Sequence, residues 1–482
     1  MAAIPVGALL TEAANTDYPF WTCQMKKTTL LIIAGLIISL LSYARSERAD
    51  IAIQNVTVID ATGASAKAGM TILIAGTRIR QVGSTQSIKV GKAVRVVDGS
   101  GKFLIPGLWD MHVHPYSGKD DRWKDFMAIF IANGITSVRV MFGEPLFHRW
   151  REEISAGRLI GPRMIIASHA PPEFRSQEEG RQFVRQSKRD GADFIKIHSD
   201  GLARDVYFAI ADEARQQEMP FLGHVPYSIS AVEASDVGQL SLEHKHAVSI
   251  PCSVREEEIR KELAQIDNLR DRTRTMASVG YDPQRARGLF SRFMANGTFV
   301  CPTLVVWNDP AYREKAEMAN DPRLAFFPSE LRNWFRNMGE RLIDDKVVAD
   351  LRRICSGSLH LVGEMNQAGV KLLAGTDSGG VPFVLQAFSL HDELRLLVES
   401  GLSPMEALRA ATANAAECAG RRETLGTIEI GKIADLVLLE GNPLSSIAST
   451  MKIDSVFFNG KYFSRTDLDG IRKGLKKLAA EM

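Results

Sequence analysis

The sequence has few cysteines and no closely spaced pair of them. Five cysteines occur in 482 residues and none forms a Cys-x-x-Cys pair, so the sequence indicates neither a thiolate zinc site nor a dithiol redox site. After residue 44 the cysteines are widely separated, at Cys252, Cys301, Cys355 and Cys418. They could form disulfides or lie singly in the core as small buried side chains, and the sequence leaves both alternatives open.

Long runs of one charge are also missing. The 59 basic and 57 acidic residues give a formal net charge of +2 and are spread along the chain. This distribution gives no indication of binding to nucleic acid or to an acidic polymer. The partner that we expect is a small-molecule substrate. A homo-oligomer is compatible with the sequence, which does not decide the oligomeric state.

The apolar run near the N-terminus is too short for a membrane span. It covers about a dozen residues, 30–41, whereas a spanning helix needs roughly 20. Met25-Lys26-Lys27 precedes it and Ser42-Tyr43-Ala44 follows it, which is typical of a secretory signal peptide. We therefore expect a signal peptide over 25–44, no stable membrane anchor, and a periplasmic or secreted protein. Residues 1–24 form a doubtful leader without targeting logic, which makes Met25 the expected start.

Two β-rich segments lie far apart in the chain, at 50–105 and 426–465. Both contain short apolar runs separated by turn signals, and Asn459-Gly460 is a strong signal for a two-residue hairpin turn. Segments of this kind can pair with each other around whatever lies between them. We predict a composite β-sandwich domain built from both segments, followed by a C-terminal helix over 466–482.

Between these segments, residues 106–425 alternate between apolar runs of strand length and helical stretches. This repeat predicts a parallel sheet, and its length suits an α/β fold of the (β/α)8 TIM barrel type. The eight expected strands are 103–108, 135–141, 163–167, 194–197, 220–223, 239–242, 298–306 and 370–374.

Two features lie between or after these strands. The helix near Pro404 should start with a capping box, because Ser403 can cap it and Glu406 stands three residues later. A long insertion, about 307–357, is rich in Arg, Glu and aromatic residues. It could close the active site or form a subunit contact.

Polar residues stand at the expected strand ends, where barrel enzymes place their catalytic groups. His112 and His114 are two residues apart, so extended backbone would point both imidazoles to the same side. The other members of this series are Lys196, His224, His244 and Asp377. Singly, each could be a packed or capping residue. Together at the ends of one set of strands, they predict a metal site.

Imidazole and carboxylate groups suit zinc, and four His with one Asp exceed what one tetrahedral ion needs, so we expect a second ion. Lys196 stands between two isoleucines in an apolar run. Burial there should lower its pKa toward neutrality, and a neutral amine can react with carbon dioxide to give a carbamate that bridges two metals. A buried salt bridge or a snorkelling side chain is the alternative.

At this point the sequence resembles a family. Five motifs occur in the order found in the amidohydrolase superfamily, and the chain is most similar to the carboxylated-lysine members of the imidazolonepropionase-like and Xaa-Pro dipeptidase-like group. These motifs are DMHVH (110–114), DFIKIH (193–198), GHV (223–225), LEH (242–244) and AGTDSG (374–379). The segments GKIADLV (431–437) and GNPL (441–444) also look like the returning β-segment of that family.

The resemblance implies a ligand set and a mechanism. His112, His114 and Asp377 would hold one zinc ion, His224 and His244 the other, and carboxylated Lys196 would bridge the two. A metal-bridging hydroxide would attack the substrate carbonyl. Asp377 would take the proton and pass it to the leaving nitrogen, which makes it the catalytic residue.

Substrate contacts are less defined by the motifs. Tyr227, His198 and His169 are candidates, although each could equally be structural. Strand two departs from the pattern of relatives, which often read VRD, because Val140 follows Arg139 here. The missing carboxylate puts any substrate role of that strand in doubt.

The predicted function is hydrolysis of an amide-type C–N bond in a dipeptide, an N-acyl amino acid or a cyclic amide. The alternative is a mononuclear deaminase or lactam hydrolase of the imidazolonepropionase type, which would use His112, His114, His224 and Asp377 without a carboxylated lysine. A non-catalytic binding protein is a third hypothesis. All the expected ligand types are present, which argues against it.

Overall fold

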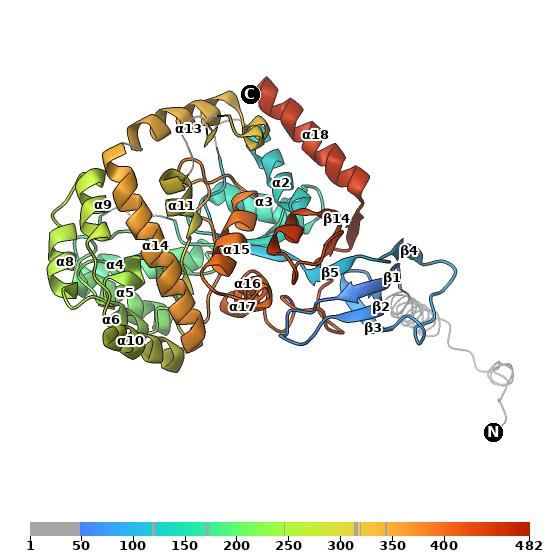
Figure 1. Cartoon of the computed structure of the whole chain (residues 1–482), viewed down its shortest axis with the longest axis horizontal. Coiled ribbons are helices and arrows are strands. Elements are labelled where there is room, and N and C mark those ends of the chain that lie inside the picture. The colour runs from blue at the N-terminus through green and yellow to red at the C-terminus, as the bar shows by residue number, and fades with distance from the viewer. Residues whose placement is uncertain are drawn as a thin grey trace, which may run out of the picture.

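The computed structural model describes residues 49–482, except 118–120, 170–172, 245, 313–316, 319 and 343–344. The expected leader and signal peptide lie outside these residues. In the described part of the chain, no helix is both long enough and apolar enough to cross a membrane. The fold is α/β: helices surround a central set of strands, and a separate sheet lies at one side (Figure 1).

Strands from both ends of the described chain form that side sheet, in the order β15-β14-β13-β5-β1-β2-β3, with β4 paired to β1. At the junction of the two segments β5 is antiparallel to β13, with Ile105 opposite Val437. The hairpin at Asn459-Gly460 is confirmed, since both residues have positive φ and Phe458 pairs with Lys461. The sandwich and the domain bounds stay predictions. The strands are β1 (Ile51–Val58), β2 (Lys67–Ala75), β3 (Arg78–Ser84), β4 (Arg95–Asp98), β5 (Phe103–Pro106), β13 (Leu436–Leu439), β14 (Ile453–Phe458) and β15 (Lys461–Phe463).

The central strands form two parallel sheets, β6-β7-β8 and β12-β11-β10-β9. Single parallel bridges occur where the two sheets meet, at Ala167–Phe194 on one side and at Val300–Leu372 and Val113–Ser378 on the other. The strands are β6 (Leu108–Val113), β7 (Ile135–Val140), β8 (Arg163–Ile166), β9 (Ile195–Ile197), β10 (Phe221–Gly223), β11 (Ser241–Glu243) and β12 (Phe299–Cys301).

Three expected strands differ from the observed ones. The run 103–108 is divided at Pro106-Gly107, and its first half, β5, belongs to the side sheet. The run 298–306 ends as a strand at Cys301, because Thr303 has a φ of 47° and the helix α11 begins at Val305. The run 370–374 forms only an isolated bridge at Leu372.

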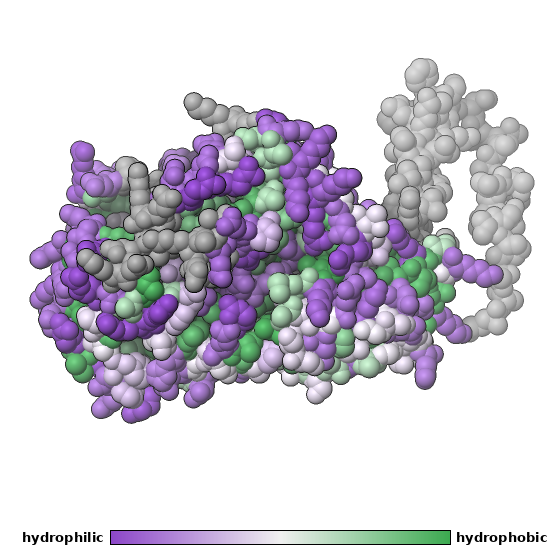
Figure 2. Space-filling view, turned by 45° about the horizontal axis from the view of Figure 1, so that its top comes forward, coloured by the Kyte–Doolittle hydropathy of each residue, from purple (hydrophilic) through white to green (hydrophobic). Residues whose placement is uncertain are grey.

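Helices cover the central strands, and the predicted capping box of Ser403 and Glu406 is confirmed at the start of α16. No disulfide joins the four cysteines after residue 44, all of which are buried. The surface in Figure 2 is largely hydrophilic, with apolar residues in scattered patches. The helices are η1 (Asp121–Met127), α2 (Ala128–Ala132), α3 (Pro145–Ser155), α4 (Gln177–Arg189), α5 (Arg204–Gln216), α6 (Ala231–Asp236), α7 (His246–Ser249), α8 (Glu256–Leu263), α9 (Leu269–Ala277), α10 (Pro283–Asn296), α11 (Val305–Tyr312), η2 (Pro322–Phe326), α13 (Ser329–Leu342), α14 (Asp345–Ala368), α15 (Ser389–Glu399), α16 (Pro404–Ala410), α17 (Ala413–Cys418), η3 (Ile447–Met451) and α18 (Arg465–Glu481).

Candidate metal centre

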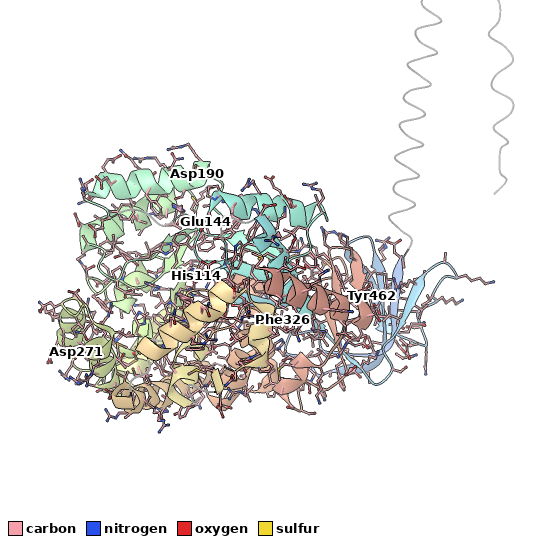
Figure 3. The ribbon with its side chains drawn as sticks, turned by 90° about the horizontal axis from the view of Figure 1, so that it is seen from above. His114, Glu144, Asp190, Asp271, Phe326 and Tyr462 are labelled. Atoms are coloured by element: carbon pink, nitrogen blue, oxygen red, sulfur yellow. The ribbon has the colours of Figure 1, made fainter. Side chains whose placement is uncertain are left out.

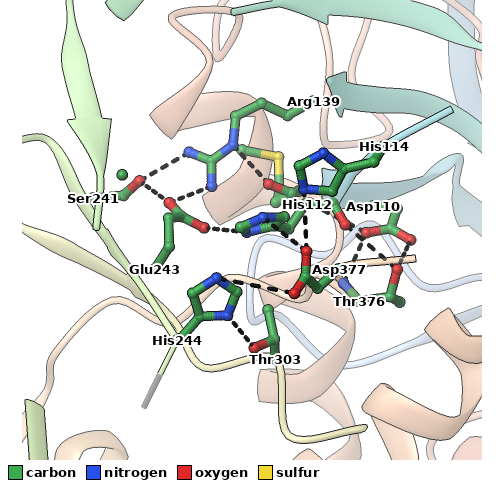
Figure 4. A network of polar contacts seen from close by, with 12 residues as sticks. Asp110, His112, His114, Arg139, Ser241, Glu243, His244, Thr303, Thr376 and Asp377 are labelled. Carbon is green, nitrogen blue, oxygen red and sulfur yellow. Dashed lines mark hydrogen bonds and ion pairs between the residues drawn. The ribbon is translucent and has the colours of Figure 1, made fainter. Parts of the chain in front are cut away.

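Three imidazoles converge on the carboxylate of Asp377 (Figure 4). The Nε2 atoms of His112 and His114 lie 3.2 and 3.1 Å from Asp377 Oδ1, and His244 Nε2 lies 4.0 Å from Oδ2. His112, His244 and Asp377 together could hold a metal ion. Seen from above, His114 lies near the middle of the molecule (Figure 3).

The strand geometry explains this convergence. His112 lies within β6, one residue before its end, rather than after the first strand as expected. His114 follows two residues later, so both imidazoles extend to the same side, with ring centroids 5.4 Å apart. His244 follows β11 directly, with a φ of 64°. The side chains therefore meet at the carboxyl ends of parallel strands.

The electrostatics of the group suit a cation. Burial lowers the pKa of His114 and lowers that of His244 much further, so both imidazoles are neutral at pH 7. Burial opposes ionisation of Asp377, but His112 and His244 hold its pKa well below the usual range. Neutral nitrogen donors around one ionised carboxylate are the ligand set that zinc takes.

A buried ion pair between Glu243 and Arg139 contacts His112 on the side of the ring away from Asp377. Sequence reasoning did not find this pair. Glu243 is 0% exposed. Its Oε2 lies 2.9 Å from His112 Nδ1, while Oε1 accepts hydrogen bonds from Arg139 Nη2 at 2.7 Å and Ser241 Oγ at 2.5 Å. Burial opposes ionisation of Glu243, yet Arg139 and His112 hold its pKa below the usual range. The carboxylate thus accepts a hydrogen bond from Nδ1–H of His112, which leaves Nε2 as an electron-pair donor.

A pair of hydrogen bonds joins β6 to the loop that carries Asp377. Asp110 Oδ2 accepts a hydrogen bond from Thr376 Oγ1 at 2.7 Å, and its Oδ1 accepts from the Thr376 amide at 3.0 Å. Burial raises the pKa of Asp110 to about 7. Gly375 allows the close approach of the loop, because a Cβ there would lie 2.5 Å from Cys301 Sγ and 2.9 Å from the His112 amide. These hydrogen bonds hold the backbone next to Asp377, whose φ is 61°, in place.

Lys196 is buried at the centre of β9 and is 2% exposed. No described residue forms a hydrogen bond or an ion pair with its Nζ, so the salt bridge that the sequence left open is not formed in the described part of the chain. Burial lowers its pKa to about 8. Gly223 on the neighbouring strand leaves room for the side chain, since a Cβ there would lie 2.9 Å from Lys196 Cδ.

His224 follows β10 and lies beside His244, with ring centroids 5.0 Å apart. Its Nδ1 is 3.0 Å from Asp200 Oδ1, a carboxylate that sequence reasoning also missed. Burial opposes ionisation of Asp200, but contacts with His224, His246 and Arg272 lower its pKa. Arg272 Nη2 donates to Asp200 Oδ2 at 3.2 Å and to the hydroxyl of Tyr227 at 2.6 Å. Tyr227 therefore already has a partner in Arg272.

The two remaining candidates for substrate contact, His169 and His198, follow the strands β8 and β9, and both contact the ring of Phe142. The rings of His169 and His198 meet Phe142 edge-on, at centroid distances of 5.4 and 5.7 Å. His169 Nδ1 lies 2.7 Å from the Gly143 carbonyl. Burial lowers the pKa of His198 to about 2, and its buried Nε2 has no hydrogen-bond partner among the described residues. Of the two, His198 is the one with a buried ring nitrogen that lacks a partner among the described residues.

A cavity of about 450 Å³ adjoins Lys196 and His198. Its walls combine the apolar side chains of Phe174, Phe183 and Leu202 with polar groups, among them Glu173 and His198. Such a cavity accommodates a group with both apolar and polar parts next to the candidate metal centre.

A second group, His112 with Glu243 and Cys301, also has ligand-type atoms close together. It does not suit a metal, because Glu243 is committed to Arg139 and Ser241. In addition, burial raises the pKa of the Cys301 thiol well above its usual range, which keeps the sulfur protonated. Of the two groups, the one around Asp377 is therefore the better candidate for a metal ion.

Comparisons with known proteins agree with this geometry. A family profile described as "Amidohydrolase family" matches residues 324–462. Ochratoxinase from Aspergillus niger is 24% identical over 433 residues, which cover 75% of this chain and 75% of that protein.

Solved structures show the same fold. A bottromycin amidohydrolase superposes with a TM-score of 0.68 at 20% identity and covers 89% of this chain and 90% of its own. A Xaa-Pro dipeptidase with bound methionine gives a TM-score of 0.63 at 20% identity, covering 86% and 99%. The profile match and these superpositions show that the chain is similar to amidohydrolases over residues 324–462 and that it has the fold of the solved amidohydrolase structures.

Proposed function

We propose that this protein is a binuclear zinc amidohydrolase that cleaves an amide-type bond in a dipeptide, an N-acyl amino acid or a cyclic amide. The observation that carries the proposal is the convergence of three imidazoles on Asp377, close to a buried lysine without a partner in the described chain. The names of the relatives, an ochratoxinase and a Xaa-Pro dipeptidase, support amide substrates.

The proposal includes a closed (β/α)8 barrel. The parallel bridges at Ala167–Phe194, Val300–Leu372 and Val113–Ser378 connect the two central sheets on both sides. Closure brings β9, which carries Lys196, across from β6, which carries His112. Ligands at the same ends of several strands then face one pocket.

In this centre His112, His114 and Asp377 would hold one ion, His224 and His244 would hold the other, and carboxylated Lys196 would serve as a ligand to both. Bound zinc would supply Lewis acidity toward the substrate carbonyl and toward the attacking water. Glu243 fixes the tautomer of His112 through its hydrogen bond. Asp200 lies 3.0 Å from His224 Nδ1 and supports that ring electrostatically. Both carboxylates act through the histidines that they contact.

Asp377 moves the proton. Because its pKa is held low, the carboxylate is ionised at neutral pH and can accept the proton of the attacking water. The same carboxyl group then protonates the leaving nitrogen, which prevents the amine from departing as an unstable anion. Asp377 is therefore the catalytic general base and acid of the proposal.

The metal assay tests the binuclear part. We expect about two zinc ions per chain, loss of activity on chelation and recovery with zinc. Lys196→Ala is expected to lose the bridge and most of the metal, whereas Lys188→Ala, at an exposed lysine bound to the Gln217 carbonyl, serves as the matched control. One zinc per chain with full activity of Lys196→Ala would favour the mononuclear alternative.

A substrate screen tests the reaction itself. The zinc-loaded protein is incubated with dipeptides, N-acyl amino acids and lactams, and product amines are measured. Hydrolysis of none of these classes would contradict the proposal. Export from the cytoplasm, proposed from residues 25–44, is tested by N-terminal sequencing of the mature protein.

A further inference from the structure

A cavity of about 340 Å³ lies where the side sheet meets the central strands. The starts of β6 and β8, the end of α3 and the turn after β14 all contribute to its wall. Figure 1 shows α3 next to β14, and Asn459 Nδ2 donates to the Ser155 carbonyl at 3.3 Å. Three arginines line the cavity, Arg151, Arg163 and Arg421, and we call it the arginine cavity.

The arginines give this cavity an excess of positive charge. Arg163 Nε lies 2.7 Å from Asp435 Oδ2, and Arg151 Nη1 lies 2.7 Å from Asp193 Oδ2. Arg421 is exposed, and no described residue forms a hydrogen bond or an ion pair with its guanidinium. No Asp or Glu is among the described residues that line the cavity. One of the three positive charges therefore has no counter-charge in the described part of the chain.

Arg163 also keeps an unused donor. It binds Asp435 through Nε and Nη2, at 2.7 and 3.4 Å. Its Nη1 has no partner in the described chain and is not a buried atom, so solvent can reach it. A guanidinium carries five N–H donors in a flat fork that matches the two oxygens of a carboxylate or phosphate group. Arg163 and Arg421 thus offer accessible donors to an anion.

The rest of the wall is largely apolar. It includes Trp109, Met164 and Leu425, which are all buried. Phe458 also lines the cavity, and the guanidinium of Arg163 lies over its ring, 5.3 Å from the centroid. A guanidinium held by a ring and by a carboxylate is in position before an anion arrives, which reduces the entropy lost on binding. The cavity therefore combines a positive region with an apolar one.

We propose that the arginine cavity binds a small organic anion. Its carboxylate or phosphate group contacts Arg421 and Arg163, and its apolar body packs against Trp109 and Phe458. A volume of about 340 Å³ lies within the range of roughly 300–1,000 Å³ that is typical of small-molecule sites. Arg163 belongs to the central strands and Phe458 to the side sheet, so the bound anion connects these two parts of the molecule.

This site is separate from the candidate metal centre. Arg163 is the first residue of β8 and Trp109 is the second residue of β6. The candidate metal centre lies at the opposite, carboxyl ends of the parallel strands. The inference therefore does not depend on the proposed amide hydrolysis.

Calorimetric titration of chelator-treated protein tests the site with 2-naphthoate and 2-naphthyl phosphate, which carry the two kinds of anionic group on the same rings. At least one of them is expected to bind at one site per chain, and their affinities show which group is preferred. 2-Naphthylmethanol has the rings without the charge, and acetate and inorganic phosphate have the charge without the rings. All three should bind at least about tenfold more weakly than the naphthyl anion.

Arg421→Met should weaken binding of the naphthyl anion by at least about tenfold, because charge-assisted hydrogen bonds are lost. Arg421 is preferred to Arg163 for this test, since loss of Arg163 would leave the buried Asp435 without its partner. Arg422→Met is the matched control, because Arg422 is the neighbouring exposed arginine and does not line the cavity. Equal binding by wild type and Arg421→Met would overturn the proposal, as would binding of neither naphthyl anion.

Two further measurements separate this site from the metal centre. At 100 times its Kd the naphthyl anion should raise the Tm of the metal-free protein by about 2–3 °C, and Arg421→Met should reduce this shift. The affinity should be the same after zinc is restored. An affinity that depends on zinc would place the anion at the metal centre and would contradict the assignment to the arginine cavity.

Discussion

Replacing Glu243 by glutamine is expected to weaken both the fold and the metal centre. The substitution removes the charge that faces Arg139, whose guanidinium is itself only 1% exposed. Leaving one member of a buried ion pair without its partner costs about 3–5 kcal/mol. Unfolding entropy of about 2.1 cal/mol/K per residue amounts to about 1 kcal/mol per degree for a chain of this size. The Tm of the metal-free protein should therefore fall by about 3–5 °C.

The effect on zinc has a different origin. Without the carboxylate at 2.9 Å, His112 loses its fixed tautomer and part of its basicity. Substitution of such a supporting group lowers metal affinity by about 10–100-fold. The double variant R139M/E243Q separates the two effects, because it removes both buried charges. It should recover much of the lost Tm but none of the lost zinc affinity.

Scanning calorimetry of chelator-treated protein and competition of zinc with a chromophoric chelator provide the two measurements. Glu213→Gln is the matched control, since Glu213 is a buried, ion-paired glutamate on α5 that contacts no proposed ligand. Zinc affinity of the double variant equal to that of wild type would refute the supporting role of Glu243. An unchanged Tm in Glu243→Gln would refute the ion-pair argument.

Three further substitutions test separate parts of the structure. Gly223→Ala places a Cβ 2.4 Å from the Ile197 carbonyl, so it should lower both the stability and the zinc content of the protein. Gly297→Ala, which has open space around it, should cost only about 1 kcal/mol of stability. Equal losses of stability for the two variants in calorimetry would contradict this reasoning. Burial raises the pKa of Glu393 from 4.5 to about 8. Between these two values the folded protein holds a proton on Glu393 that the unfolded chain has released. The stability of the fold should therefore fall as the pH rises from 5 to 8. Glu393→Gln should flatten that dependence of Tm, and an unchanged slope would count against it. Ser403→Ala should cost about 1 kcal/mol by removing the cap of α16, measured as a lower urea midpoint.

The proposed metal ligands could be named from the sequence because each stands in a short local motif at the end of an apolar run, and their metal binding stays a prediction. Their common position follows from the parallel order of the strands, so His112, His114 and Asp377 could be placed near one another without coordinates. The buried support was not predictable. Glu243 lies in the LEH motif, but its partner Arg139 is 104 residues away, and only the folded sheet brings the two together.

The strand boundaries also depend partly on neighbouring residues and partly on segments far along the chain. The expected strand 103–108 is apolar on both sides of Pro106-Gly107 and reads as one strand. Its first part pairs with β13 and its second part with β7. Which partner each half takes depends on strands far along the chain. The Asn459-Gly460 turn and the Ser403 cap, in contrast, depend on neighbours within a few residues, and both were correct.

The pairing of β5 with β13 has a consequence for the order of folding. Synthesis delivers β1 to β5 early, yet the edge of β5 opposite β1 stays without its partner until β13 has been made, after all the central strands. Contacts between such distant segments form slowly, because a long loop must be closed first. The side sheet is therefore expected to form completely only after the central strands have been synthesised. Its formation then follows the synthesis of the whole central region.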